Sequence, residues 1–281
     1  MHHQDKLDLV KASPATVAAH DRSGWMDLFA LYAMVEDPVG GAPHHSGGFD
    51  RRSGRRGHTV LGRFYDTYIA PNQVRFAVDH DLVCGEVVLR DLTVHVQMSA
   101  KVIAQVPMHL QYELVQEEGR GWRIRRLAAH WEVLPMILQV LGKGPAGWQV
   151  LTTFGLRVLR LQGLTGMLGF SLAFLHAGRR GKALVQRFFA LAEEGNAAAL
   201  AGLFCDNHDG IHQPSGRTDP AAFRPEQTLR ISKLLVAGQV VSCSLKQGDR
   251  PGIGLFEFDR RSRRLHRVRL FFQDQGPHSG V

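Results

Sequence analysis

The strongest constraint on the fold is a change of hydrophobic period near residue 72. Beyond it, apolar residues alternate with polar ones, which is typical of half-buried antiparallel strands. The alternation includes Val87, Leu89, Leu92, Val94, Val96 and Met98. It continues over residues 102–115 and 122–133, which are joined by a turn at 117–121. Helices followed by an antiparallel meander predict an α+β domain.

The segment before residue 72 has helical spacing. Ser13 and Pro14 favour a helix start, because serine caps the first turn and proline suits the first helical position. The pattern predicts helices over residues 14–20, 25–32 and 61–69, the last of which carries Phe64 and Tyr65. The polar residues 1–12 predict a disordered tail. The Gly- and Arg-rich stretch 43–57 predicts a mobile loop.

One acidic motif lies between these helices. It reads Val-Glu-Asp-Pro-Val-Gly over residues 35–40. Pro38 biases Asp37 toward an extended conformation, and Gly40 allows a sharp turn after it. The apolar neighbours Val35 and Val39 suggest that Asp37 faces an apolar space, where a carboxylate has a raised proton affinity. Asp37 is therefore a candidate for proton transfer near neutral pH, or else a turn aspartate.

This motif has aromatic companions at fixed places. They are Trp25, Phe29, Phe64, Tyr65 and Trp131. Together they resemble the ketosteroid isomerase branch of the NTF2-like superfamily over residues 12–133. The resemblance implies a curved sheet around an apolar cavity, with Asp37 as general base. It further implies that Tyr65 belongs to the hydrogen-bond network, that Val35, Val39, Phe64 and Trp131 contact the ligand, and that no cofactor or metal takes part.

The family's oxyanion donors do not transfer cleanly to this chain. The position of the family's catalytic tyrosine falls on Ser13, and that of its protonated aspartate falls on Gln111. The neighbouring Tyr112 belongs to the apolar phase of its strand. A shift of one residue would exchange the faces of Gln111 and Tyr112, so both stay candidates.

Composition sets the outer limits. A chain of 281 residues with 44% apolar residues has room for about two globular domains. The three cysteines form no close pair, and no signal peptide or membrane span is predicted, so we expect a cytoplasmic protein. The net charge of +8 is scattered over arginine clusters without a nucleic-acid motif, so no nucleic acid partner is predicted.

The second half of the chain divides into two parts. Residues 134–180 are apolar and Gly-rich, and predict either a helical connector packed between domains or a segment lying on a membrane through 148–180. Residues 181–281 resemble a degenerate second NTF2-like copy, with Gln213 in the place of Asp37. Strands are expected over 228–235, 240–246, 254–259 and 265–272, which makes this copy shorter by at least one strand. It would pair with the first domain, residues 13–133, or cover its cavity.

These observations favour a steroid Δ-isomerase-like enzyme that moves a proton within a 3-oxosteroid or similar hydrophobic ketone. The alternative is a non-catalytic module that binds a hydrophobic ligand or a protein partner, because fold alone does not fix function. A cyclase or hydratase of the same superfamily is a third hypothesis. The two domains would pair within one chain, or the protein would form a homodimer.

Overall fold

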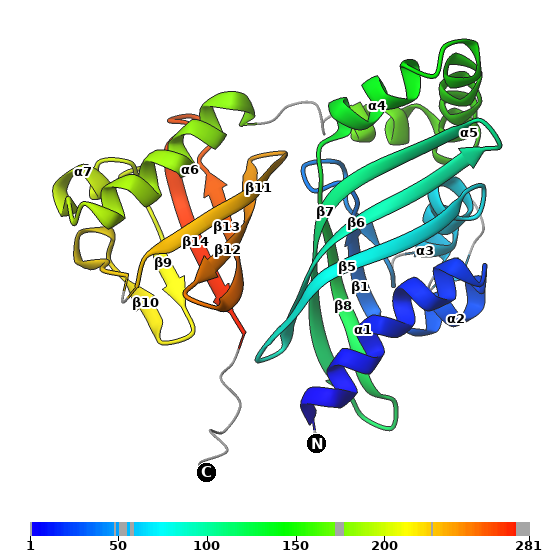
Figure 1. The fold of residues 1–281 in the computed structure, drawn as a ribbon. Coiled ribbons are helices and arrows are strands. Elements are labelled where there is room, and N and C mark those ends of the chain that lie inside the picture. Colours follow the sequence, from blue (N-terminus) through cyan, green and yellow to red (C-terminus); the bar gives the residue numbers. More distant parts are fainter. Residues whose placement is uncertain are drawn as a thin grey trace.

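The computed structural model describes residues 2–47, 49–50, 55–56, 59–171, 177–225 and 227–273, and it is built from two six-stranded sheets with helices (Figure 1). The first sheet has the strand order β2-β1-β8-β7-β6-β5. Its strands are β1 (Phe29–Glu36), β2 (His44–His45), β5 (Gln73–Cys84), β6 (Val87–Ser99), β7 (Val102–Glu117) and β8 (Gly121–His130). Only the β1–β8 pair is parallel, so the sheet is mostly the antiparallel meander that the alternation predicted.

The second sheet repeats this topology. Its order is β10-β9-β14-β13-β12-β11, and β9 and β14 are its parallel pair. Its strands are β9 (Gly210–Gln213), β10 (Gly216–Thr218), β11 (Leu229–Ala237), β12 (Val240–Gln247), β13 (Arg250–Phe258) and β14 (Leu265–Phe272). The predicted internal repeat is therefore present. The expectation of a missing strand was wrong, because the short hairpin of β9 and β10 supplies the edge that the sequence pattern hid.

The N-terminal segment differs from its prediction. Helix α1 spans His2–Ala18, so the expected disordered tail is helical, with Pro14 inside the helix. Packing explains the difference, because Val10 is fully buried and Leu7 contacts the same core. Lys6 also fixes this segment, since its ammonium lies 4.4 Å from the ring centroid of Trp122.

The second predicted helix is shorter than expected. Helix α2 spans only Arg22–Asp27, and the chain then enters β1. The spacing of Trp25 and Phe29 mimicked one helical face, and both are buried, whereas Tyr32 is 73% exposed on the strand. Pairing of β1 with β8 prevails here over local helical spacing. Between these strands and β5 lie β3 (Phe49–Asp50), β4 (Arg55–Arg56), α3 (Thr59–Phe64) and a π-helical turn at Tyr65–Ile69. Most of the predicted mobile loop 43–57 lies outside the described residues.

The two sheets pack against each other through their outer faces. Leu82 and Leu89 of the first sheet meet Ile253 and Leu255 of the second in a buried apolar cluster. A polar network lies beside this cluster. In it, the ring nitrogens of His109 lie 2.8 and 3.0 Å from the hydroxyls of Ser242 and Ser244, and Ser244 and Lys233 donate to Asp91. The second sheet therefore pairs with the back of the first instead of covering its inner face.

The helices after β8 close the other side of the first sheet. They are α4 (Val133–Leu141) and α5 (Pro145–Ser171), and α5 bends at Gly163, which has φ of +72°. Helices α6 (Gly178–Glu193) and α7 (Ala197–Ala201) and a 3-10 turn at Pro220–Ala222 belong to the second sheet. Figure 1 shows α5 beside the first sheet and away from the second. The segment expected to fill the space between domains instead covers the first sheet's interior.

Candidate functional site

A cavity of about 770 Å³ lies within the first sheet, beneath α1, α3 and α5. Apolar side chains make up most of its wall, including Val94, Val106, Met108, Leu110 and Met136. Among the described residues that line it, Asp37 is the single carboxylate. The cavity is therefore suited to a hydrophobic molecule of drug or sterol size with few polar groups.

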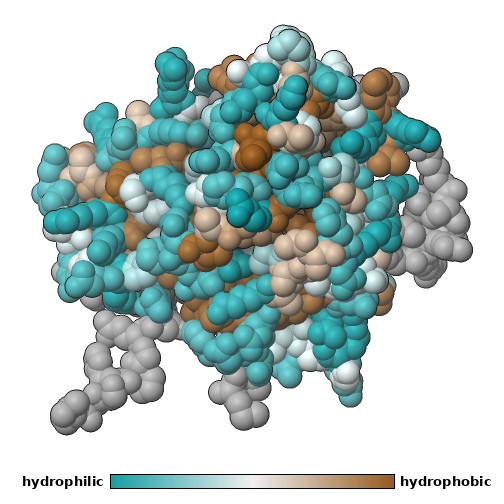
Figure 2. All heavy atoms as spheres, turned by 45° about the vertical axis from the view of Figure 1, so that its right-hand side comes forward, coloured by the Kyte–Doolittle hydropathy of each residue, from teal (hydrophilic) through white to brown (hydrophobic). Residues whose placement is uncertain are grey.

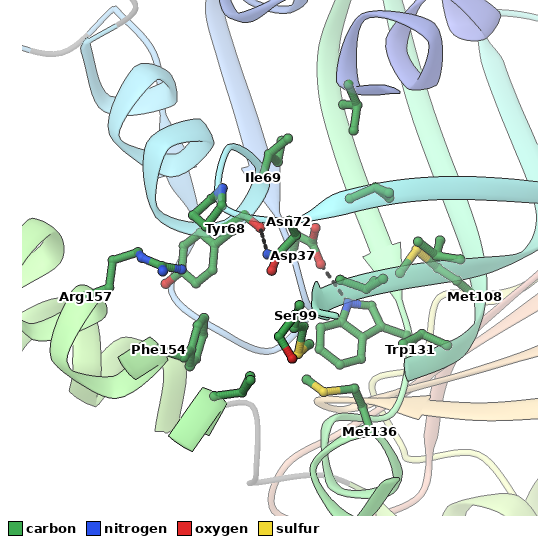
Figure 3. A pocket seen from close by; sticks show the side chains of 18 of the residues that line it. Asp37, Tyr68, Ile69, Asn72, Ser99, Met108, Trp131, Met136, Phe154 and Arg157 are labelled. Atoms are coloured by element: carbon green, nitrogen blue, oxygen red, sulfur yellow. Dashed lines mark hydrogen bonds between the residues drawn. The ribbon is translucent and has the colours of Figure 1, made fainter. Parts of the chain in front are cut away.

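Asp37 directly follows β1 and faces this cavity. Its Oδ1 accepts a hydrogen bond from Nε1 of Trp131, at 2.6 Å (Figure 3). Burial raises the pKa of Asp37 to about 6, although the bond from Trp131 holds the pKa lower than burial alone would. A carboxylate with this pKa is mostly ionised at neutral pH and can both accept and return a proton.

The turn after Asp37 is braced by the second half of the chain. Val39 is buried with Ala128 and Ala237, and its backbone N–H donates to the carbonyl of Ala129 at 2.9 Å. Gly40 has φ of +93°, and a Cβ placed on it would lie 2.3 Å from Cα of Gly238. This close approach of two glycine backbones requires glycine on both sides. It links the position of Asp37 to the β11–β12 hairpin of the second sheet.

The β7 register separates the two candidates that the sequence left open. Tyr112 faces the cavity, whereas Gln111 is buried on the opposite face, where its Nε2 donates to Glu113 Oε1 at 3.1 Å. The phenol of Tyr112 lies beside Ser13 and the guanidinium of Arg90, and burial raises its pKa. Ser13 lines the cavity as well. Tyr112 and Ser13 are therefore hydroxyl donors available to a ligand, and Gln111 is not.

A second tyrosine replaces the predicted one at the cavity wall. Tyr65 does not line the cavity, and its ring centroid lies 5.6 Å from that of Trp25. Tyr68 lines it instead, and burial together with the nearby charge of Asp37 raises the pKa of Tyr68 to about 12. Phe64 lies four residues earlier on the same helix face. That spacing from a predicted cavity residue was the signal that could have pointed to Tyr68.

The other predicted ligand contacts divide evenly. Phe64 and Trp131 line the cavity, whereas Val35 is enclosed in the core and Val39 in the contact between the two sheets. Within the described residues, no three His, Cys, Asp or Glu side chains are grouped so that they could hold a metal ion.

No protein-family model matches the sequence, and no curated protein matches it either. Several solved structures are similar to about half of this chain. A Mycobacterium tuberculosis protein in complex with estradiol-17beta-hemisuccinate is 24% identical, with a TM-score of 0.37, over 46% of this chain and 95% of its own. The Delta 5-3-ketosteroid isomerase of a Mycobacterium species is 26% identical, with a TM-score of 0.36, over 44% and 91%. A Mycobacterium tuberculosis epoxide hydrolase of the LEH-like type is 14% identical, with a TM-score of 0.38, over 53% and 96%.

These neighbours are proteins of the NTF2-like superfamily, as the sequence resemblance predicted. Each of them covers about half of this chain, and the two sheets of the chain share one strand order. The activity has to be argued from the cavity itself.

Proposed function

We propose that the protein is a cofactor-independent isomerase that moves a proton between two carbons of a hydrophobic ketone, such as a 3-oxosteroid. The observation that supports this most directly is Asp37, a buried carboxylate with a pKa of about 6 that faces an apolar cavity. Asp37 would remove a proton from the carbon next to the carbonyl and return it to a carbon further along the conjugated system. No atom is gained or lost, so no co-reactant is needed.

The developing enolate needs a hydrogen-bond donor at its oxygen. Tyr112 and Ser13 supply hydroxyl groups on the same cavity wall. Tyr112 lies on β7 opposite Leu127, and Asp37 follows the β1 residue that pairs with Ala128. Strand spacings of ~4.8 Å across and ~3.4 Å along the sheet place the two Cα atoms roughly 12 Å apart. This separation leaves room for a ring between the base and the donor.

A binding experiment separates an enzyme from a passive pocket. The steroid phenol equilenin resembles the enolate, whereas a saturated steroid alcohol of similar size does not. We expect equilenin to bind at least about tenfold more tightly, because Tyr112 and Ser13 would hold its oxygen in place of the enolate. Equal affinity for the two steroids, together with no isomerisation of a 5-ene-3-oxosteroid, would favour a non-catalytic binding module.

A membrane surface is a further proposed partner, reached through the outer face of α5. Trp148 is 61% exposed and Leu156 is 68% exposed, and Leu159 lies on the same helix face. Figure 2 shows hydrophobic side chains at the surface in the upper part of the molecule, where α4 and α5 lie. Residues 133–171 contain no acidic residue, and two of their three basic residues, Lys143 and Arg160, are exposed. An apolar face with a basic border is complementary to anionic lipid. None of the described helices is long and apolar enough to cross a bilayer.

A further inference from the structure

Helix α5 turns an arginine toward the cavity. Its inner face bears Ala146, Val150, Phe154 and Arg157, which follow one another at helical spacings of three and four and all line the cavity. Figure 3 shows Arg157 extending from α5 toward Tyr68. Arg160, one turn later, is exposed to solvent and does not line the cavity. Two arginines of the same helix therefore occupy different surroundings.

The guanidinium of Arg157 has no partner of opposite charge. Among the described residues it makes no hydrogen bond or ion pair, although it is half-buried. Lys101, in the turn between β6 and β7, is a second cation on the cavity wall and likewise has no acidic partner among the described residues. Asp37 does not neutralise them, because its environment is set by burial and by Trp131. The cations and the carboxylate therefore occupy separate parts of the cavity.

An unpaired cation on an apolar wall is unfavourable unless an anion joins it. A guanidinium presents two parallel N–H donors, a geometry that matches a carboxylate, sulfate or phosphate. We infer that the natural ligand is an amphipathic acid: an apolar, ring-sized body whose acidic group meets Arg157, with Lys101 as the second cation. This inference rests on the proposed function in one respect, namely that the cavity binds a hydrophobic ketone.

The test compares two ligands that differ in one negative charge and one methyl group. The probes are 3-oxo-4-androstene-17β-carboxylic acid and its neutral methyl ester, titrated against the full chain by quenching of tryptophan fluorescence. We expect the wild-type protein to bind the acid about tenfold or more tightly than the ester, since a charge-assisted hydrogen bond in a half-buried site has this strength. The preference should weaken as salt is added.

Two variants assign the preference to one residue. Arg157→Gln should remove the preference for the acid and leave the ester affinity unchanged, which also shows that the cavity is folded. Arg160→Gln is the matched control, because it removes the same charge from the same helix outside the cavity, and it should keep the preference. Equal binding of acid and ester by the wild type, binding of neither, or an intact preference in Arg157→Gln would overturn the inference.

The outcome is separable from that of the proposed function. If the acid is preferred through Arg157 but no steroid ketone is isomerised, the inference stands and the isomerase proposal fails. If the neutral ketone is isomerised at the same rate by wild type and Arg157→Gln while acid and ester bind equally, the isomerase proposal stands and the inference fails.

Discussion

The two halves of the chain have the same strand order but different interiors. The first sheet encloses a cavity of about 770 Å³, whereas the core of the second is filled by phenylalanines. Phe188 lies at their centre, with ring centroids 5.2 to 6.3 Å from those of Phe189, Phe204, Phe223 and Phe256. Rings at these distances contact one another directly, so they occupy the space that the first half leaves open.

The residues at the ends of the two corresponding strands, β1 and β9, also differ. Asp37 follows β1 and faces the cavity, whereas β9 ends at Gln213, whose amide cannot accept a proton at neutral pH. The second half retains the strand order of the first. It packs on the back of the first sheet and braces the turn after Asp37 through Gly238. One fold thus serves once as a site and once as a support.

The largest expected effect comes from making the first half resemble the second at the base. Asp37→Asn should lower isomerisation of a 5-ene-3-oxosteroid by about 10²- to 10⁴-fold, measured by the appearance of the conjugated ketone, because the amide keeps the shape and loses the base. Affinity for equilenin should stay within a few-fold. Gln213→Ala is the control and should leave the rate unchanged. A comparable loss in that control would mean that the second half is catalytic.

The same substitution has a stability readout with a definite sign. The pKa of Asp37 is raised in the folded protein, so its contribution to folding is full below the unfolded pKa and is lost as the pH rises through about 6. At pH 8 the unfolding free energy of Asp37→Asn should therefore exceed that of the wild type by up to about 3 kcal/mol. The variant should accordingly melt at a higher temperature. If Asp37→Asn were less stable than the wild type at pH 8, burial of the ionised Asp37 carboxylate would not be destabilising.

The next effect concerns the donor on β7. Tyr112→Phe should slow turnover by about 10²- to 10³-fold, because it removes the hydroxyl that would hold the enolate oxygen. Gln111→Leu and Tyr65→Phe test the neighbouring strand residue and the other predicted tyrosine, and both should change turnover by less than about tenfold, since neither side chain lines the cavity. A rate loss in Gln111→Leu that matches Tyr112→Phe would contradict the assigned register of β7.

The bracing of the first half by the second can be broken at one glycine. Gly238→Ala would place a methyl group 2.5 Å from Cα of Gly40, which must displace the turn after Asp37. A displacement of this kind should cost about ten- to a hundredfold in turnover. Gly85→Ala is the matched control: Gly85 has φ of +61°, close to the +55° of Gly238, but a Cβ there meets no atom within 4 Å. Equal turnover rates in the two variants would show that the position of Asp37 does not depend on the second half of the chain.

The smallest effect is expected at the outer face of α5, a helix that lies beside the first sheet and away from the second. The protein should cosediment a few-fold more with phosphatidylserine vesicles than with phosphatidylcholine vesicles, because the segment carries only positive charge. A double substitution, Leu156→Ser with Leu159→Ser, should remove most of this binding. Leu31→Ser, on β1, is the control, since Leu31 is equally a surface residue at 50% exposure. No binding by the wild type would exclude this contact.

The sequence predicted the parts of the fold that depend on local pattern. The alternation located the long strands, and the acidic motif with its aromatic companions located Asp37 and Trp131. The sequence could not show that Asp37 and Trp131 are hydrogen-bonded, because they are 94 residues apart and their contact depends on the β1–β8 pairing. The face of Tyr112 depended on a register that period-two alternation leaves open by one residue.

Other features are decided by tertiary packing, which local propensity does not contain. The N-terminal residues are polar on average, yet α1 begins at His2 because buried Val10 anchors it. The sequence resemblance singles out the Phe-Tyr pair at 64–65, whereas the turn that follows places Tyr68 at the cavity wall. The covering role of α5 was hidden because an apolar, Gly-rich segment has the same composition whether it joins domains or closes a cavity.

The most direct test of the account is the pH dependence of kcat/KM for a 5-ene-3-oxosteroid, measured on wild type and on Trp131→Phe. If Asp37 is the base, the wild-type rate should rise with pH to a plateau, with its midpoint near pH 6. Trp131→Phe removes the hydrogen bond that stabilises the carboxylate, so its midpoint should move upward by up to about one pH unit. A pH range of roughly 4.5 to 8 covers the raised pKa of Asp37. A rate that is independent of pH over this range, or a midpoint that Trp131→Phe leaves in place, would contradict Asp37 as the proton carrier.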